Sequence, residues 1–473
     1  MKFSTYKILF LILFVLSATG CKKWLEIEPK SEVAADVLFE TPEGFSIALN
    51  GIYTSISGPE LYGSELKFNF VDVLARIYET HNSMYDQLRE YDYVTGGMDM
   101  LIQGIWATAY NAIANCNALL QHLEEKPADF FSDEQRNMLE GETRALRAML
   151  YLDLLRLFAP APIVEDAAAI PYYEGLSNEP RPYRRTSEIL GFIIEDLQES
   201  QRLQRAFDTS QQAKDRFKDR FSFDNGFFSN SRRGFRMGYY AATAFLARAA
   251  LYAGDHALAL ENATLLINEQ TADGDPVIEL TSGTKMDVGA YDRLLSDDII
   301  FGLYRMNFED RYNNVIFLTP NTGVIFGPDL HTDYRKQAYY TSDGHQVLKY
   351  DVKLEREGDL RPITSIIPMI RLSEMYHIAA EASYDNDPEA AVDYLNTLRS
   401  KRGVNIPHAG FGSKNAFLDA IINDARREYV GEGQLFFLYK RLNETVLDEA
   451  GSDQYLTEEF VLPIPEREVS LEN

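Results

Sequence analysis

The chain has 473 residues, of which 45% are hydrophobic and 25% charged, so it can bury a large core and is not disordered as a whole. Its formal net charge of −26 disfavours nucleic acid and anionic membrane faces as partners, because both would meet net repulsion. The two cysteines, Cys21 and Cys116, are too few for a disulfide scaffold.

The first residues have the pattern of a secretory signal peptide. Lys2 and Lys7 flank an apolar run, Ile8–Leu16, that is too short to span a bilayer. Small residues then lead to Cys21, as at a bacterial lipoprotein cleavage site. We expect residues 1–20 to be removed, Cys21 to be lipidated and residues 21–41 to form a tether, since several acyl chains give lasting anchorage. The alternative is an ordinary signal peptide that is cut near an unrelated cysteine.

From residue 42 onward the sequence predicts mainly helices. Thr41 followed by Pro42 is typical of a helix start. Three stretches rich in Gly, Asn, Asp and aromatic residues interrupt the helical pattern, and the apolar run 299–304 indicates a short strand. Residues 42–473 are therefore expected to form a single domain, with insertions at about 58–104, 207–236 and 271–368. The expected helices are at about 42–56, 106–123, 132–158, 186–204, 239–253, 256–268, 370–384, 388–402 and 416–441.

Two distant segments, 246–259 and 378–391, share the pattern of a helix, a tight polar turn and an alanine-rich helix. Small residues such as Ala259 and Ala391 let paired helices approach closely, as in tetratricopeptide units of about 34 residues. The predicted fold class is mainly α, an irregular tetratricopeptide-like helix-hairpin scaffold with long loop-rich insertions and a few short strands. The alternative is that the two hairpins are alike by coincidence.

Several charged residues could be read either as catalytic or as structural. Glu374 and Glu381 lie seven residues apart on one helix face with Arg371, and could form an acid/base pair. Charged groups on the inner face of a packed helix are costly unless paired, however, so an Arg–Glu network is the favoured interpretation. The same interpretation applies to Glu428 with Glu432 and to Glu142 with Arg147.

The sequence has no His-x-x-x-His spacing, no Gly-x-Ser-x-Gly motif and no phosphate-binding glycine loop. We therefore predict no metal site, no cofactor and no catalytic residue. The segment 207–236 is basic and aromatic, which could suit nucleic acid. Export makes that partner improbable, and leaves an anionic ligand, a transporter contact or a surface loop with half-buried phenylalanines.

The ordered set of motifs resembles the SusD/RagB family of outer-membrane nutrient-uptake lipoproteins over nearly the whole mature chain. It starts with Cys21 and a Leu-x-x-x-Pro opening, and continues through Gly-Glu-Thr-Arg-Ala-Leu-Arg at 141–147, Arg-Arg-Glu-Tyr-Val-Gly at 426–431 and Leu-Pro-Ile-Pro-Glu at 462–466. The resemblance implies a protein that is not an enzyme. It implies a lipid-anchored, cell-surface subunit that binds oligosaccharide or peptide in a shallow aromatic site and acts as the lid of a SusC-like TonB-dependent transporter.

Aromatic residues in the insertions are the candidate ligand contacts. The chain has 28 Tyr and 28 Phe, and a tyrosine ring offers an apolar face with a hydroxyl edge that suits a sugar or an extended peptide. The alternative is that these rings pack the insertions on the scaffold. The candidates are Asp72, Arg76, Tyr78, Asn82, Tyr85, Tyr91 and Tyr93, near Tyr62, in the first insertion, and Tyr304 and Tyr312, near Tyr291, in the last.

Two rival functions belong to other classes. A surface glycoside hydrolase would use paired carboxylates and release reducing ends from a glycan. A helical-repeat scaffold that binds only proteins would have no affinity for a small ligand.

Overall fold

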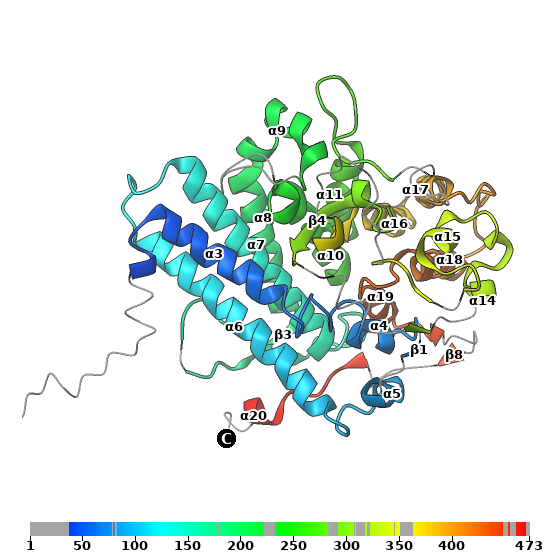
Figure 1. Ribbon diagram of the computed structural model, residues 1–473, viewed down its shortest axis with the longest axis horizontal. Helices are drawn as coiled ribbons and strands as arrows, with labels where there is room; N and C mark the ends of the chain where they lie inside the picture. Colours follow the sequence, from blue (N-terminus) through cyan, green and yellow to red (C-terminus); the bar gives the residue numbers. More distant parts are fainter. Residues whose placement is uncertain are drawn as a thin grey trace, which may run out of the picture. The chain divides into compact units, whose positions relative to one another are not determined.

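The structure is a computed structural model of the chain, drawn in Figure 1. It describes residues 37–77, 79–80, 83–177, 179–221, 232–281, 283, 292–306, 308, 317–318, 322–344, 346–350, 363–447, 453–454 and 460–469. The predicted signal peptide, Cys21 and most of the tether lie outside these residues. Within the described residues, no helix has the length and apolar character needed to cross a membrane.

The chain divides into two units, residues 1–47 and 48–473. Helix α3 (Pro42–Ile56) starts in the first unit and has the predicted bounds. The hydroxyl of Thr41 accepts a hydrogen bond of 3.2 Å from the N–H of Gly44, which satisfies one free donor of the first turn. In the same unit, the rings of Phe39 and Phe45 have their centroids 4.7 Å apart.

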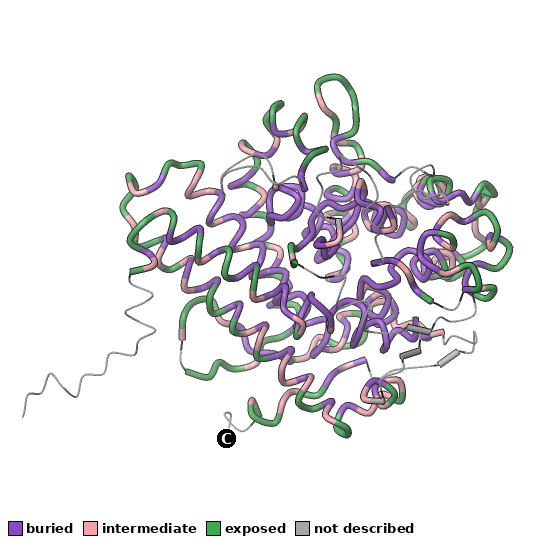
Figure 2. Tube along the Cα trace, in the orientation of Figure 1, coloured by how far each residue is buried: buried purple, intermediate pink, exposed green. Residues whose placement is uncertain are grey.

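Three long helices make up the first half of the second unit: α6 (Met98–Glu125), α7 (Asp133–Phe158) and α8 (Thr186–Asp208). Helix α7 packs against both of the others. It begins at a capping box, in which Ser132 and Gln135 bond to each other's backbone N–H. Residues 145–158 are buried on every side, as Figure 2 shows for the interior of the helix layer. Helix α7 is thus the central element of this half.

The two predicted helix hairpins are confirmed as α10 (Tyr239–Ala253) with α11 (His256–Asn268), and α16 (Leu372–Ser383) with α17 (Pro388–Lys401). Asp255 and Asp387 cap the second helix of each hairpin through hydrogen bonds of 3.0 Å to backbone N–H groups. Helix α11 packs against α16, so units more than a hundred residues apart are neighbours. This stacking confirms the predicted tetratricopeptide-like fold class.

The prediction of one continuous helix over residues 416–441 is wrong. The structure has two helices there, α18 (Lys414–Glu428) and α19 (Leu435–Leu442). Between them Gly431 and Gly433 have φ values of 75° and 67°, in the left-handed region that interrupts a helix and favours glycine. The backbone N–H groups of this turn donate hydrogen bonds to a carboxylate that is far away in the sequence.

The start of the predicted helix 370–384 also differs. Ile370 and Arg371 end a strand, β6 (Ile366–Arg371), which pairs antiparallel with β4 (Ile299–Tyr304), the strand predicted at 299–304. The β-branched residues of both strands favour this pairing over helix. Arg371 then becomes the N-cap of α16, which fixes its side chain at the centre of the molecule's ion-pair network.

The insertions contain short elements. The helices are α4 (Phe70–Leu74), α5 (Ser83–Arg89), α9 (Gln211–Arg216), α14 (Thr322–Phe326) and α15 (Tyr334–Tyr339). In the insertions, strand β1 (Glu79–Thr80) pairs antiparallel with β5 (Phe317–Leu318). Outside them, β2 (Ala168–Pro171) pairs antiparallel with β3 (Tyr183–Arg185), and β7 (Val446–Leu447) with β8 (Asp453–Gln454). The last described helix is α20 (Glu466–Val469).

Candidate functional site

The first and last insertions, which carry the candidate ligand residues, are joined in the structure. Strand β1 of the first pairs with β5 of the last. Phe68 packs edge-on against Phe308, with ring centroids 5.8 Å apart, and both rings contact Tyr350. Arg305 donates a hydrogen bond of 2.5 Å to the carbonyl of Ser57, where the first insertion begins. We call this region, made of the described residues within 57–93 and 304–350, the insertion junction.

Two of the candidate residues hold the junction together through buried polar contacts. Asp72 has no exposed surface, and its carboxylate accepts hydrogen bonds of 2.7 and 2.9 Å from the N–H groups of Gly431 and Gly433. Arg76 is buried and donates 2.5 Å to the carbonyl of Arg89 and 3.2 Å to the hydroxyl of Tyr91. Both side chains therefore fasten the first insertion, Asp72 to the turn between α18 and α19 and Arg76 within the insertion itself.

Several candidate tyrosines also pack inward. The hydroxyl of Tyr85 donates to the carboxylate of Glu65 at 3.0 Å, and burial raises the pKa of Glu65 to about 7. Tyr93 is buried, and Tyr62 is buried with its hydroxyl 2.6 Å from Asp153. These contacts favour the alternative that such rings pack the insertion on the scaffold; their role in ligand binding stays a prediction.

Among the candidate tyrosines that the structure describes, only Tyr304 is exposed. It ends β4, has 38% of its surface exposed, and rests edge-on against Phe235 with centroids 5.6 Å apart. Met306, two residues on, is 69% exposed. Because β4 is paired with β6, the ring of Tyr304 stands on a rigid strand at the edge of the junction. Tyr78, Asn82, Tyr291 and Tyr312 lie outside the described residues.

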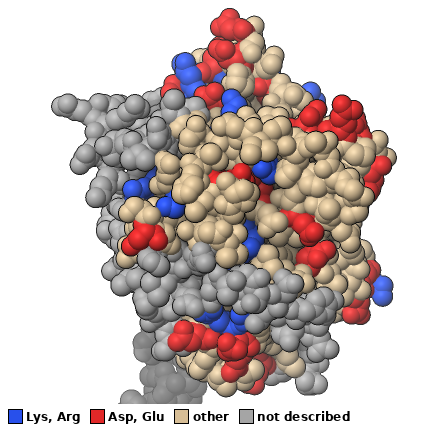
Figure 3. All heavy atoms as spheres, turned by 90° about the vertical axis from the view of Figure 1, so that its right-hand side faces the viewer, with Lys and Arg blue, Asp and Glu red and all other residues tan. Residues whose placement is uncertain are grey.

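The face that carries α14, α15 and α18 is seen in Figure 3. Among the atoms drawn in colour, acidic and basic side chains are scattered over a larger uncharged area. This distribution is typical of a solvated surface, whereas a phosphate-binding face concentrates lysine and arginine. The coloured part of this face therefore suits an uncharged ligand better than a polyanion.

The predicted Arg–Glu network is buried in the structure. Glu428 accepts hydrogen bonds from Arg371 at 2.6 Å, from Arg402 at 2.7 Å and from Arg335 at 3.0 Å. Burial alone would raise the pKa of Glu428, but the three guanidinium groups outweigh it and hold that pKa well below its usual range. Arg371 also binds Glu432. The network ties α18 to α15, α16 and α17, so it fixes the scaffold beneath the insertions.

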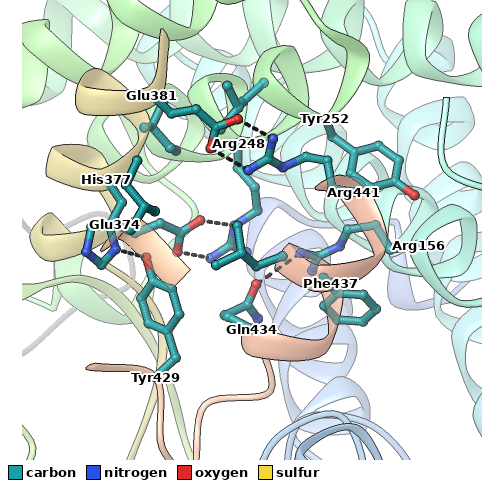
Figure 4. A pocket seen from close by; sticks show the side chains of 14 residues that line it. Arg156, Arg248, Tyr252, Glu374, His377, Glu381, Tyr429, Gln434, Phe437 and Arg441 are labelled. Atoms are coloured by element: carbon teal, nitrogen blue, oxygen red, sulfur yellow. Dashed lines mark hydrogen bonds and ion pairs between the residues drawn. The ribbon is translucent and has the colours of Figure 1, made fainter. Parts of the chain in front are cut away.

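The two glutamates considered as an acid/base pair line a small internal cavity of about 60 Å³. Figure 4 shows that each faces its own arginine: Glu374 receives two hydrogen bonds of 2.6 Å from Arg248, and Glu381 receives two, of 2.5 and 2.7 Å, from Arg441. Carboxylates held in this way are not placed to give and take protons on a substrate. The arrangement supports the structural interpretation.

Glu142 and Arg147, which were given the same structural interpretation, do not pair with each other. Five residues turn a helix by about 500°, so the two side chains leave α7 in different directions. Arg147 instead pairs with Asp196 of α8 at 2.8 Å, and Glu142 pairs with Arg233 and Arg236 at 2.7 Å. Both contacts nevertheless hold the scaffold, as the structural interpretation expects.

These contacts also account for much of the basic segment 207–236. Three of its five described arginines, Arg220, Arg233 and Arg236, are buried, whereas Arg216 is exposed and Arg232 half-buried. Arg220 donates to the carbonyl of Ile299 at 2.7 Å, and the other two buried arginines hold Glu142. The sequence could not show these partners, because they lie about 80 to 90 residues away along the chain. Among the described residues, no cluster of His, Cys, Asp and Glu is placed to hold a metal ion.

A scaffold of stacked helix hairpins with loop-rich insertions defines a class of tetratricopeptide-like binding proteins. Residues 23–251 match a family model described as "Starch-binding associating with outer membrane", and residues 330–461 match the model of the SusD family. The chain belongs to the SusD/RagB family.

Curated relatives and solved structures agree with this assignment. A SusD-like protein, P25, of Formosa agariphila is 24% identical over 199 residues, which are 40% of this chain and 36% of that protein. A SusD-like protein of Bacteroides ovatus is 26% identical over 119 residues, 24% of this chain and 21% of that protein. The matched segments thus span well under half of these relatives.

The solved structures show the fold. A SusD superfamily protein from Bacteroides thetaiotaomicron has a TM-score of 0.69 at 21% identity, covering 91% of this chain and 98% of that one. A putative sugar binding protein from Bacteroides vulgatus has a TM-score of 0.70 at 21% identity, covering 91% of this chain and 96% of that one.

Proposed function

We propose that this protein captures glycan, or a peptide, at the outer membrane and delivers it to a SusC-like TonB-dependent transporter, for which it acts as a lid. The observation that carries the proposal is the junction of the two aromatic-rich insertions on a scaffold of this family. The description of the matching family model, starch binding at the outer membrane, supports the same reading.

The junction offers the contacts that a neutral sugar needs. Tyr304 provides an exposed ring on a rigid strand, and apolar ring faces stack on the C–H face of a pyranose. The scaffold holds its loops through buried ion pairs, so little conformational entropy is lost when a ligand binds. A capture protein that must pass its ligand onward needs only modest affinity.

The membrane attachment rests on Cys21. A lipidated Cys21 followed by a tether would keep the protein at the outer membrane while the folded part reaches a partner. Exposure on the cell surface and contact with the transporter belong to the same proposal. They are tested by protease accessibility in intact cells and by co-purification of the transporter from detergent-solubilised outer membranes.

The binding activity is tested with the mature protein and a panel of oligosaccharides and short peptides in titration calorimetry, while reducing ends are measured in the same samples. We expect one ligand class to bind reversibly and to be recovered intact. Release of reducing ends would favour the glycoside hydrolase instead. Transporter association without affinity for any small ligand would favour a protein-binding scaffold.

A further inference from the structure

A groove of about 400 Å³ follows α6, between this helix, the loop residues 173–177 and 179–180, and the C-terminal residues 465–468. Its volume lies within the roughly 300–1,000 Å³ of small-molecule sites. None of its lining residues belongs to the insertion junction. In Figure 1 the red helix α20 lies close to the N-terminal part of α6, where the groove begins.

The loop wall of the groove is fastened by buried polar contacts. Asn117 of α6 donates hydrogen bonds of 3.0 and 3.3 Å to the carbonyls of Tyr173 and Gly175, while its own oxygen accepts 2.7 Å from Arg147. The hydroxyl of Tyr110 donates 2.8 Å to the carbonyl of Pro171. Because the loop is held at several points, the groove is a fixed feature of the fold and not a gap that side chains close.

The segment just before the C-terminal lining residues is held in place as well. The N–H of Leu462 donates 3.0 Å to the carbonyl of Leu157, at the end of α7. The ring of Phe460 packs against Phe436 with centroids 5.6 Å apart. A site with rigid walls binds with a small entropy loss.

Aromatic rings form the floor and one side of the groove. Trp106 is 5% exposed and lies 4.8 Å from the ring of Tyr110, which contacts Tyr173 edge-on at 6.0 Å. Ala107 and Ala114 are exposed and small, so they leave the space above these rings open.

Amide and charged side chains line the rim. Gln103 and Asn111 lie two turns apart on the same face of α6. An amide carries both a donor and an acceptor, which matches a pair of neighbouring sugar hydroxyls. Glu179, Arg467 and Glu468 add two negative charges and one positive, a balance that disfavours an anionic ligand.

We propose that this groove is a second saccharide-binding site, which takes a short neutral oligosaccharide. Aromatic rings and amides together, with no net positive charge among the lining residues, suit sugar hydroxyls better than a phosphate or a lipid chain. Two sites on one rigid scaffold can hold one long glycan at two points, which raises the overall affinity without stronger contacts at either.

Two matched substitutions separate this site from the rest of α6. Asn111 and Asn115 are both exposed asparagines of the same helix, but only Asn111 lines the groove. Asn111→Ala should weaken binding roughly fivefold, and Asn115→Ala should leave it unchanged. Ala107→Trp fills the groove and should weaken binding at this site by about tenfold or more. Circular dichroism melting shows whether Ala107→Trp is folded, and if it is not, the asparagine pair decides.

The probes are maltohexaose, cellohexaose and xylohexaose, with trigalacturonic acid and trialanine for comparison, titrated into the mature protein and followed by NMR. We expect two independent binding events for one neutral hexaose, of which the groove variants weaken one and Tyr304→Ala weakens the other. A Tyr304→Ala variant in which both events keep their native affinity would leave the groove proposal standing and contradict the proposed junction site. Unchanged neutral-sugar binding in both groove variants, binding of no neutral hexaose at millimolar concentration, or loss of only the acidic sugar or the peptide would overturn the proposal.

Discussion

The carboxylate of Asp72 accepts a hydrogen bond of 2.7 Å from the backbone N–H of Gly431, 359 residues further along the chain. We expect Asp72→Asn to lower the free energy of unfolding by roughly 3 kcal/mol, because the new amide NH2 would face a backbone N–H donor at a buried position. Urea denaturation measures the loss. Asp86→Asn, at an exposed position of α5, is the control and should stay within about 0.5 kcal/mol of the native protein.

Removing a buried charge partner should cost more than removing an exposed one. Glu142→Ala leaves Arg233 and Arg236 buried without their shared carboxylate, and should destabilise the fold by roughly 3–5 kcal/mol. The control is Glu199→Ala, which breaks a surface pair with Arg202 and should change stability by less than about 1 kcal/mol. Equal effects of the two substitutions would show that the buried network is not what stabilises the scaffold.

Glu65 should make stability depend on pH. Burial raises its pKa from 4.5 to about 7, so between these values the folded protein binds more protons than the unfolded chain. The free energy of unfolding therefore falls as pH rises through this window. Glu65→Gln removes the titrating group while keeping an acceptor for Tyr85, and should gain on the order of 2 kcal/mol relative to the native protein at about pH 8 but little at about pH 5. If the free energy of unfolding changes with pH in the same way in both proteins, groups other than Glu65 cause the dependence.

The exposed ring of Tyr304 should matter for ligand binding and little for folding. Tyr304→Ala is expected to weaken glycan binding at the junction about fivefold to tenfold, the effect of about 1 kcal/mol per stacked ring. The melting temperature should barely move, and Tyr304→Phe, which keeps the ring, should bind nearly as well as the native protein. A folded Tyr304→Ala variant with native affinity would place the site elsewhere. Tyr85→Ala is not a suitable probe, because Tyr85 is buried against Glu65.

Cys21→Ala should leave a folded protein that is no longer anchored. Partitioning between detergent and aqueous phases measures the change, since the lipid is the predicted membrane attachment. The native protein should enter the detergent phase and the variant the aqueous phase. A variant that still enters the detergent phase would refute the lipoprotein interpretation.

Local signals in the sequence predicted much of the scaffold. Helix α3 and both helices of the first hairpin have the expected bounds, because a proline at the first turn, capping aspartates and a glycine turn act within a few residues. The break between α18 and α19 was missed, although Gly431 and Gly433 stand in the sequence. The surrounding apolar spacing fits one helix, and the turn is stabilised by Asp72 from the far end of the chain.

The candidate sites were harder to predict, because they too depend on residues that are far apart in the sequence. Whether a tyrosine of the first insertion faces solvent depends on partners such as Asp153 for Tyr62, which no local pattern shows. The α6 groove needs a wall from residues 465–468, so the helical spacing of Trp106 and Tyr110 could indicate a packed face but not a groove beside it.

The bond between Asp72 and the turn at Gly431 also sets an order of events during folding. Lys67 has the same dependence, since it donates to the carbonyls of Pro368 and Glu432. A chain that emerges from its N-terminus cannot give Asp72 its partner before Gly431 of the 473 residues is available, and Lys67 has to wait for Pro368 and then for Glu432. We therefore expect the first insertion to be fastened only after the last helices have formed. Contacts between such distant residues form slowly, and a chain truncated before Gly431 should keep its scaffold helices but lack the hydrogen bonds that hold Asp72.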